Sequence, residues 1–172
     1  EILGDGFNNI LLSIKDRFSA PTQMLLTSAT LTPDVSEICE KLTSSPIRIF
    51  ARREDLARSG LKQYHVAVST EAEEEKIALC AQIYERVRSL QTIIFANKIS
   101  TVEALYRRFR NKGAAVGIMH REVPMKERER TLEKLRSQSI MLLVTTDVWA
   151  RGIDIQSVMA TINFDMPYRL ET

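Results

Sequence analysis

The stretch MLLVTTDVWARGIDIQ, residues 141–156, decides the fold of this chain. It opens with a short apolar run, Met141–Val144, of the kind that forms buried strands in parallel sheets. Residues with polar or flexible character follow: Thr145, Thr146, Asp147, Arg151, Gly152 and Asp154. In open α/β sheets, ligands bind beyond the carboxyl ends of the strands. The pattern therefore predicts contact with a nucleotide or a phosphate group, and an ordinary polar loop after a strand is the alternative.

Apolar runs and amphipathic helices alternate along the chain. The side chains of Phe7, Ile10, Leu11, Ile14 and Phe18 recur at helical spacing and predict a helix with one apolar face. Short runs with strand character lie at 24–27, 47–50, 64–68, 92–97, 115–120, 141–146 and 161–166. Strands that alternate with helices imply parallel sheets flanked by helices, with right-handed crossovers. The predicted fold class is α/β.

A charged segment divides the chain. Residues 51–61, ARREDLARSGL, contain Gly60 and lack an apolar period, which is typical of a linker between domains. We therefore expect residues 1–50 and 62–172 to belong to different α/β units.

The composition limits the class of protein. The 172 residues are 44% hydrophobic and 27% charged, with a net charge of +2, so nucleic-acid binding cannot be argued from charge alone. Cys39 and Cys80 fall on predicted apolar helix faces, which favours free thiols in a reducing compartment over a disulfide or a metal site. His65 and His120 lack metal-ligand spacing. Without a long apolar run or a signal-type segment, we expect no membrane insertion and a cytoplasmic or nuclear protein.

Three segments, in order along the chain, resemble motifs of one family. TTDVWARGIDIQ, 145–156, resembles motif V of the DEAD-box RNA helicases of superfamily 2. Ser28-Ala29-Thr30 resembles motif III, and IIFAN, 93–97, resembles motif IV. The similarity covers essentially the whole chain and is closest to the eukaryotic initiation factor 4A type. It implies RecA-like parallel sheets: the end of domain one at 1–50, a linker at 51–61, and domain two at 62–172, truncated before motif VI.

The resemblance also implies roles for individual residues. Asp154 would bind the ATP ribose, with Arg151 beside it, and Ser28 and Thr30 would couple ATP-site closure to RNA binding. The residues implied in RNA binding are Thr146, Gly152, Asn97, Arg128 and Arg121. Strand-end or loop capping remains the alternative for Thr146, Gly152 and Asp154, and Asn97 could instead order its own loop.

Two departures from the family weaken the expected RNA contact near Arg121. Arg121-Glu122 stand where the family has Gly-Asp, and the segment 125–128, MKER, keeps only the Arg of the family's Q-x-x-R. The basic side chains that follow belong to a helix that also carries three glutamates, so a solvated helix face is an equal alternative.

Several family motifs are missing from this sequence. It holds no G-x-x-x-x-G-K-[ST] phosphate loop and no DEAD motif, and it ends before the HRIGR-type motif VI. Hydrolysis of ATP requires a phosphate cradle, a metal carboxylate and a transition-state cation together. The sequence therefore predicts that these residues alone are inactive, with the ligands for ATP phosphates and Mg outside this segment.

The predicted function is that of an ATP-dependent RNA helicase, related to translation initiation, which remodels RNA duplexes as the complete protein. RNA, ATP and a helical-repeat scaffold protein are the predicted partners. The main alternative is a non-catalytic RNA-binding or scaffold-docking protein that kept the RecA-like fold. A DNA helicase of the same superfamily is a further alternative, which the ARGID sequence disfavours.

Overall fold

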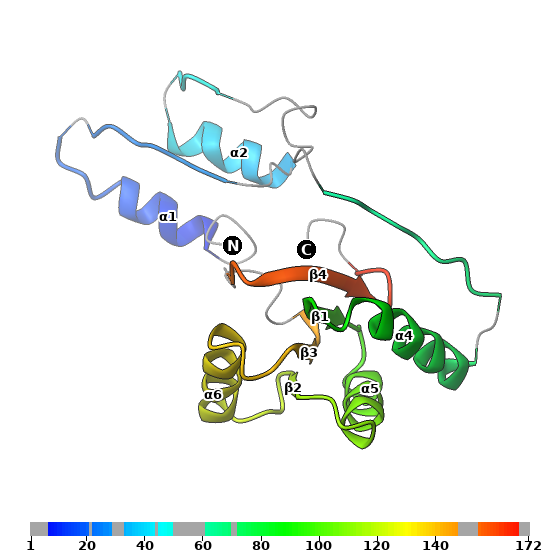
Figure 1. The fold of residues 1–172 in the computed structure, drawn as a ribbon. Helices are drawn as coiled ribbons and strands as arrows, with labels where there is room; N and C mark the ends of the chain where they lie inside the picture. Colours follow the sequence, from blue (N-terminus) through cyan, green and yellow to red (C-terminus); the bar gives the residue numbers. More distant parts are fainter. Residues whose placement is uncertain are drawn as a thin grey trace. The chain divides into compact units, whose positions relative to one another are not determined.

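The computed structural model describes residues 7–20, 22–28, 33–43, 45–49, 61–69, 72–147 and 155–168. The chain divides into two compact units, Glu1–Tyr64 and His65–Thr172 (Figure 1). No helix in the described ranges is long and apolar enough to cross a membrane.

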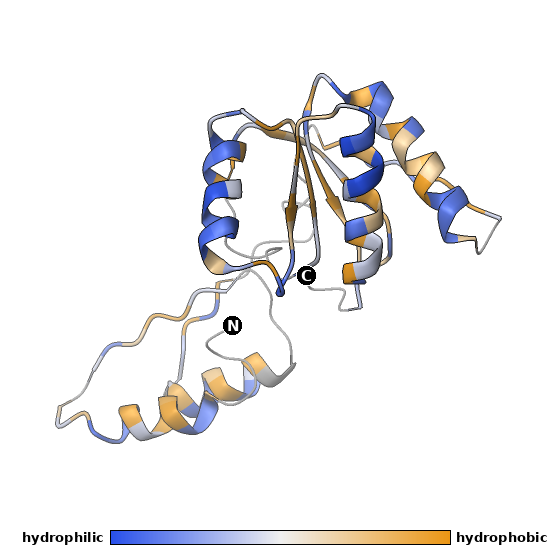
Figure 2. Cartoon of the chain, turned by 90° about the horizontal axis from the view of Figure 1, so that it is seen from below, coloured by the Kyte–Doolittle hydropathy of each residue, from blue (hydrophilic) through white to orange (hydrophobic). Residues whose placement is uncertain are grey.

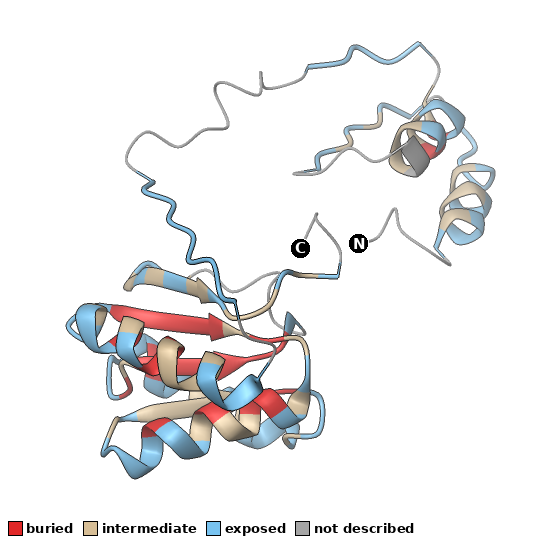
Figure 3. Ribbon diagram, turned by 90° about the vertical axis from the view of Figure 1, so that its right-hand side faces the viewer, coloured by how far each residue is buried: buried red, intermediate tan, exposed pale blue. Residues whose placement is uncertain are grey.

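The described part of the first unit contains two helices and extended segments. Helix α1 (Asn8–Lys15) follows the predicted apolar stripe but buries none of its residues, whereas α2 (Pro33–Leu42) buries Ile38 and Leu42. The strands predicted at 24–27 and 47–50 are wrong, since the described residues 22–28 and 45–49 form no strand. A strand exists only where a neighbour completes its hydrogen-bond ladder. The described extended segments of this unit are exposed or half-buried (Figure 3), and Leu25 is 89% exposed.

The second unit is a four-stranded parallel sheet with strand order β2-β3-β1-β4, which confirms the predicted α/β class. Its described elements, in chain order, are α4 (Glu73–Val87), β1 (Gln91–Phe95), α5 (Ile99–Asn111), β2 (Val116–Met119), α6 (Met125–Arg136), β3 (Leu142–Thr145) and β4 (Val158–Asn163).

Two further strand predictions, one at the boundary of the units and one at the end of the sheet, are wrong. Residues 64–68 are exposed and form no strand, again because no ladder partner lies beside them among the described residues. The last strand starts three residues earlier than predicted, at Val158, because its ladder with β1 runs from Gln91 beside Val158 to Phe95 beside Asn163. Residues 164–166 therefore follow the strand and belong to the carboxyl edge of the sheet.

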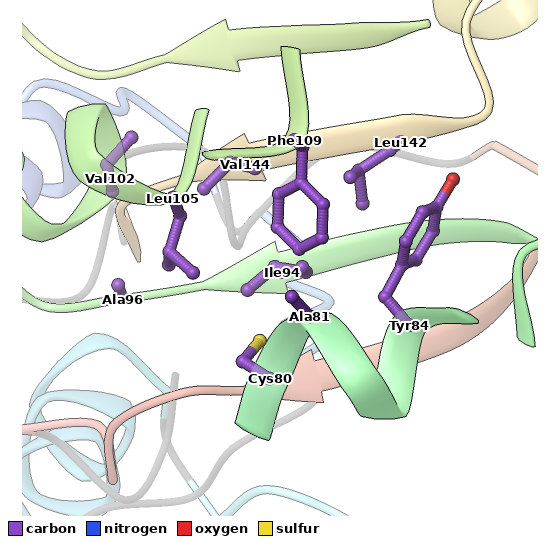
Figure 4. Close-up of a cluster of buried hydrophobic side chains, with 10 residues drawn as sticks. All are labelled: Cys80, Ala81, Tyr84, Ile94, Ala96, Val102, Leu105, Phe109, Leu142 and Val144. Carbon is purple, nitrogen blue, oxygen red and sulfur yellow. The ribbon is translucent and has the colours of Figure 1, made fainter. Parts of the chain in front are cut away.

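Helices cover both faces of this sheet. On one face, α4 and α5 pack over Ile94 and Val144 with Tyr84, Leu105 and Phe109 (Figures 1 and 4). On the other face, α6 packs over alternate strand residues; the buried cluster comprises Ile93, Met119, Leu132, Leu135, Ile140 and Leu143. Figure 2 shows apolar strands between helices whose outer surfaces are hydrophilic. All four residues of β3 are buried, as expected for a central parallel strand.

The helix starts lack the side-chain caps that their sequences suggest. The segments Thr70–Glu73 and Ser100–Glu103 resemble capping boxes, but the N-cap residues are Ala72 and Lys98, without side-chain cap hydrogen bonds. The Glu73 carboxylate instead accepts a hydrogen bond from the Thr101 hydroxyl, which joins α4 to α5. This tertiary partner replaces the local one.

A buried amide closes the amino-terminal edge of the sheet. Gln91, 3% exposed, donates from Nε2 to the carbonyl oxygens of Leu135 (2.7 Å) and Ile140 (3.0 Å). Its Oε1 accepts from the Ser157 hydroxyl at 2.5 Å. One side chain therefore joins the start of β1, the end of α6 and the turn before β4.

We expect Gln91→Met to lower the free energy of unfolding by about 1–3 kcal/mol, because buried partners of the amide lose their hydrogen bonds. Ser157→Ala removes only one of the three bonds and should cost less. Urea denaturation of both variants provides the measurement. Equal losses in the two variants would contradict a network centred on Gln91.

Both cysteines are free thiols, as predicted, and Cys80 is buried. Burial raises the pKa of the Cys80 thiol from 9.0 to about 12. The folded protein therefore keeps a proton that the unfolded chain releases above pH 9. We expect stability to fall between pH 9 and 12, by up to ~1.4 kcal/mol per pH unit from this group, and no such effect below pH 9.

The comparison is between urea midpoints of wild type, Cys80→Ala and Cys39→Ala at pH 8, 9 and 10. Cys80→Ala should show the weaker pH dependence, because it has no thiol to titrate, while Cys39→Ala should follow wild type. Identical pH dependence in wild type and Cys80→Ala would disprove the assignment.

Candidate nucleic-acid interface at the carboxyl edge of the sheet

The four parallel strands of the second unit end at one edge, and polar residues follow each of them. Asn97 comes after β1, His120 after β2, Thr146 after β3 and Asp165 after β4. Backbone hydrogen bonds extend the ladders past the strand ends, from Ala96 N to Thr145 O (3.0 Å) and from Thr146 N to Met119 O (3.2 Å). The polar groups are therefore held on the rigid sheet rather than on free loops.

Thr146, a predicted RNA ligand, is 5% exposed. Its backbone is fixed by the bond to Met119, and its hydroxyl oxygen has no hydrogen-bond partner among the residues that the structure describes. A buried hydroxyl without a partner costs free energy, so native structures rarely leave one unpaired. Strand-end capping, the alternative considered for Thr146, is thus not made by its side chain.

Asn97, a second predicted RNA ligand, contacts the segment after β4. Its backbone N–H donates to Asp165 Oδ2 (2.9 Å), and its side-chain Nδ2 donates to the Met166 carbonyl (2.8 Å). Lys76 from α4 lies 3.4 Å from Asp165 Oδ1 and 4.7 Å from the centre of the Phe164 ring. We call these residues, Lys76, Asn97 and 164–166, the strand-end junction.

The junction supports the alternative role for Asn97, in which it orders the chain locally. Because Nδ2 already donates one hydrogen bond to Met166, an RNA contact by this side chain would use its carbonyl oxygen or its second N–H. No local pattern indicates this cluster, since Lys76 and Asp165 are 89 residues apart and become neighbours only when β1 and β4 pair.

The two predicted arginines differ in their surroundings. Arg121 is exposed in the turn after His120, and its Nε lies 4.0 Å from the Glu122 carboxylate, which makes a weak surface pair. Arg128 is half-buried in the first turns of α6, where its backbone N–H donates to Pro124 O (3.1 Å). Both lie on the segment that leaves β2, so they add positive charge near this edge.

The other predicted site residues are not brought to this edge by the described part of the chain. Ser28 is exposed in the first unit. Thr30, Arg151, Gly152 and Asp154 lie outside the described residues. Within the described ranges, no group of three His, Cys, Asp or Glu side chains could hold a metal ion. The described edge carries hydroxyl, amide, imidazole and guanidinium groups, which can donate hydrogen bonds to oxyanions. Its Asp165 carboxylate is already paired with Asn97 and Lys76.

Open parallel sheets with ligand groups at the carboxyl edge define a class of α/β proteins that bind nucleotides and nucleic acids. The helicase conserved C-terminal domain model matches residues 75–172, so the chain belongs to the helicase family, and its relatives identify it as DEAD-box.

Two curated relatives illustrate the similarity. The ATP-dependent RNA helicase fal1 of Schizosaccharomyces pombe is 38% identical over 171 residues, which cover 99% of this chain and 43% of the relative. Eukaryotic initiation factor 4A-III homolog B of Oryza sativa subsp. japonica is 37% identical over 99% of this chain and 42% of its own length. The chain thus spans less than half the length of these relatives.

The fold agrees with solved structures. A Saccharomyces cerevisiae Dbp5 variant, bound to Gle1 and IP6, matches with a TM-score of 0.74 and 26% identity, over 98% of this chain and 41% of that chain. The predicted RecA-like fold is confirmed by this likeness.

The strand-end junction provides a test of the role of Asn97. We expect Asn97→Ala to lower the free energy of unfolding by about 1 kcal/mol, the usual contribution of one hydrogen bond. Amide exchange should also accelerate at Phe164, whose N–H donates to Phe95 O at 2.8 Å beside the lost contact. Lys98→Ala, at the exposed neighbouring position, is the control. Unchanged stability and exchange in Asn97→Ala would rule out the ordering role.

Proposed function

We propose that this chain is part of an ATP-dependent DEAD-box RNA helicase that remodels RNA duplexes in its complete form. The helicase family match and relatives named as ATP-dependent RNA helicases support this function. One structural observation carries the location of the RNA: Thr146, in the stretch that resembles motif V, holds its hydroxyl at the carboxyl edge of the sheet without a described partner. We propose that an RNA phosphate accepts a hydrogen bond from this hydroxyl.

The remaining site assignments belong to the same proposal. RNA would also contact Gly152, Arg121 and Arg128, whose amide and guanidinium groups donate to phosphate oxygens. Asp154 and Arg151 would contribute to the ATP site, and Mg would be held with the ATP phosphates by residues outside these 172. Ser28 and Thr30 would couple ATP binding to RNA binding.

The domain assignment is part of the proposal as well. Residues 1–50 would form the end of a first RecA-like domain, 51–61 the linker, and 62–172 most of the second domain. RNA and ATP would each contact both domains, so that binding of one ligand favours the closed state that binds the other. This coupling is what would allow ATP hydrolysis to drive the release or bending of an RNA strand.

The relatives and the free thiols support proposals for the partners and the cellular placement of the protein. Dbp5 is bound to Gle1 in its solved structure, and we propose that a scaffold protein of the helical-repeat type docks on this chain's parent in a comparable way. A relative named as an initiation factor supports a role connected with translation initiation. Free thiols suit the reducing conditions of the cytoplasm or nucleus, where we propose the protein acts.

In the complete protein, Thr146→Ala and Asp154→Ala should affect different ligands. Thr146→Ala should weaken RNA binding, because one hydroxyl donor to phosphate is lost, and leave ATP affinity nearly unchanged. Asp154→Ala should weaken ATP binding by about 1–3 kcal/mol, the scale of a hydrogen bond to a charged group. RNA affinity in the absence of nucleotide should barely change, because a carboxylate repels phosphate.

The measurement is RNA binding by each variant with and without a non-hydrolysable ATP analogue, and both variants should lose coupled affinity. Thr161→Ala, the same change at an exposed position on β4, is the matched control. Wild-type nucleotide affinity and full coupling in Asp154→Ala would exclude the assignment of this loop to motif V.

A further inference from the structure

A histidine that the sequence excluded as a metal ligand lies beside Thr146. β2 and β3 pair in parallel with Met119 beside Thr145, and the backbone bond from Thr146 N to Met119 O (3.2 Å) continues that register by one residue. His120 and Thr146 are therefore neighbours across the two strand ends. They occupy equivalent positions in the alternation of side chains and point to the same side of the sheet.

Both side chains are buried, and both have a polar atom without a partner. His120 is 6% exposed and Thr146 is 5% exposed. In the part of the chain that the structure describes, neither His120 Nδ1 nor Thr146 Oγ1 makes a hydrogen bond. Each such buried atom destabilises the folded chain. Two of them on adjacent strands indicate a prepared site whose partner comes from outside the sheet.

The chemistry of the pair favours an anion. A hydroxyl and an imidazole N–H both donate hydrogen bonds, and neighbouring strands lie about 4.8 Å apart, a span that one tetrahedral oxyanion bridges. A metal ion would need further ligands, and no group of three His, Cys, Asp or Glu residues exists in the described ranges. Arg121, exposed in the turn that starts at the His120 carbonyl, adds a positive charge nearby.

We propose that His120 is a second ligand of the RNA phosphate that Thr146 binds, with Nδ1–H and Oγ1–H each donating to one phosphodiester group. This inference rests on the proposed function, because it requires that the RNA backbone runs along the carboxyl edge of the sheet. Both contacts are hydrogen bonds, and no proton is transferred.

The first test compares variants of the complete protein for binding of a fluorescent single-stranded RNA. His120→Leu should bind about tenfold more weakly, the equivalent of one good hydrogen bond. His120→Asn, whose Nδ2 takes the place of Nδ1, should stay within about threefold of wild type. His65→Leu is the matched control, since His65 is exposed in an extended segment away from any strand.

Thermal unfolding separates binding from structure. His120→Leu removes a buried polar atom without a partner, so its melting temperature should equal or exceed that of wild type while RNA affinity falls. A purely structural histidine would give the opposite result, with a lower melting temperature and unchanged RNA affinity in the folded fraction. That result would overturn the inference.

RNAs with one methylphosphonate, placed at each position in turn, identify the phosphate. When the methylphosphonate replaces the contacted phosphate, His120→Leu should cause no further loss of RNA affinity, because an interaction that is already absent cannot be lost twice. Thr146→Val should lose its effect on RNA affinity at the same position in the RNA. If Thr146→Val identifies a phosphate and His120→Leu is additive at every position, the inference fails and the proposed function stands. If wild type binds none of the RNAs, the proposed function and the inference both fail.

Discussion

The parallel pairing of β1 with β3 and β4 is the constraint on which the second unit depends. Parallel strands need long crossover connections, so helices must lie between them in sequence and pack on both faces in space. The sheet interior, from Ile94 on one side to Leu143 on the other, is then closed to water. Because all strands run in one direction, their carboxyl ends meet, and polar residues that follow any strand are brought to the same edge.

The two edges of the sheet treat their polar groups differently. At the amino edge, the amide of Gln91 is satisfied by carbonyl oxygens and a hydroxyl of its own chain. At the carboxyl edge, Asn97 pairs with Asp165 and Met166, but His120 Nδ1 and Thr146 Oγ1 have no partner in the described ranges, although both residues are as deeply buried as much of the core. The buried polar side-chain atoms at the amino edge therefore have a structural role, whereas the two unpaired atoms at the carboxyl edge indicate ligand binding. This distinction does not depend on resemblance to other proteins.

Local pattern was enough to predict the elements whose burial is uniform. The apolar run of β3 lies where the sequence placed it, and Cys80 lies on the buried side of α4, as its predicted apolar helix face requires. The start of β4 was not predictable from sequence. Half-buried and exposed residues alternate along 158–163, and only the pairing with β1 shows which of them belong to the strand. Strands at 24–27 and 47–50 have the right composition but no neighbour in the described ranges.

The place of a site residue in the fold could be predicted only where one continuous sequence motif contains it. Thr146 follows its strand directly, so its place at the edge was readable from sequence. The sequence spacing of His120 does not indicate a metal ligand. Its position beside Thr146 depends on the register of β2 and β3, which the spacing of residues along the chain does not reveal. The strand-end junction joins residues 68 and 89 positions apart, and no local pattern reports such a contact.

The amide of Gln91 has a consequence for how the sheet is assembled. Its partners lie 44, 49 and 66 residues away along the chain, so they arrive only after α6, β3 and the turn before β4 have docked. A slip of β3 or β4 by one residue would bury the amide with its hydrogen-bonding capacity unmet. In β3, where all four residues are buried, a slip exchanges one buried residue for another, so burial alone discriminates the register less sharply there. This single polar side chain therefore discriminates the native strand alignment from its near neighbours, and so contributes fidelity in folding as well as stability.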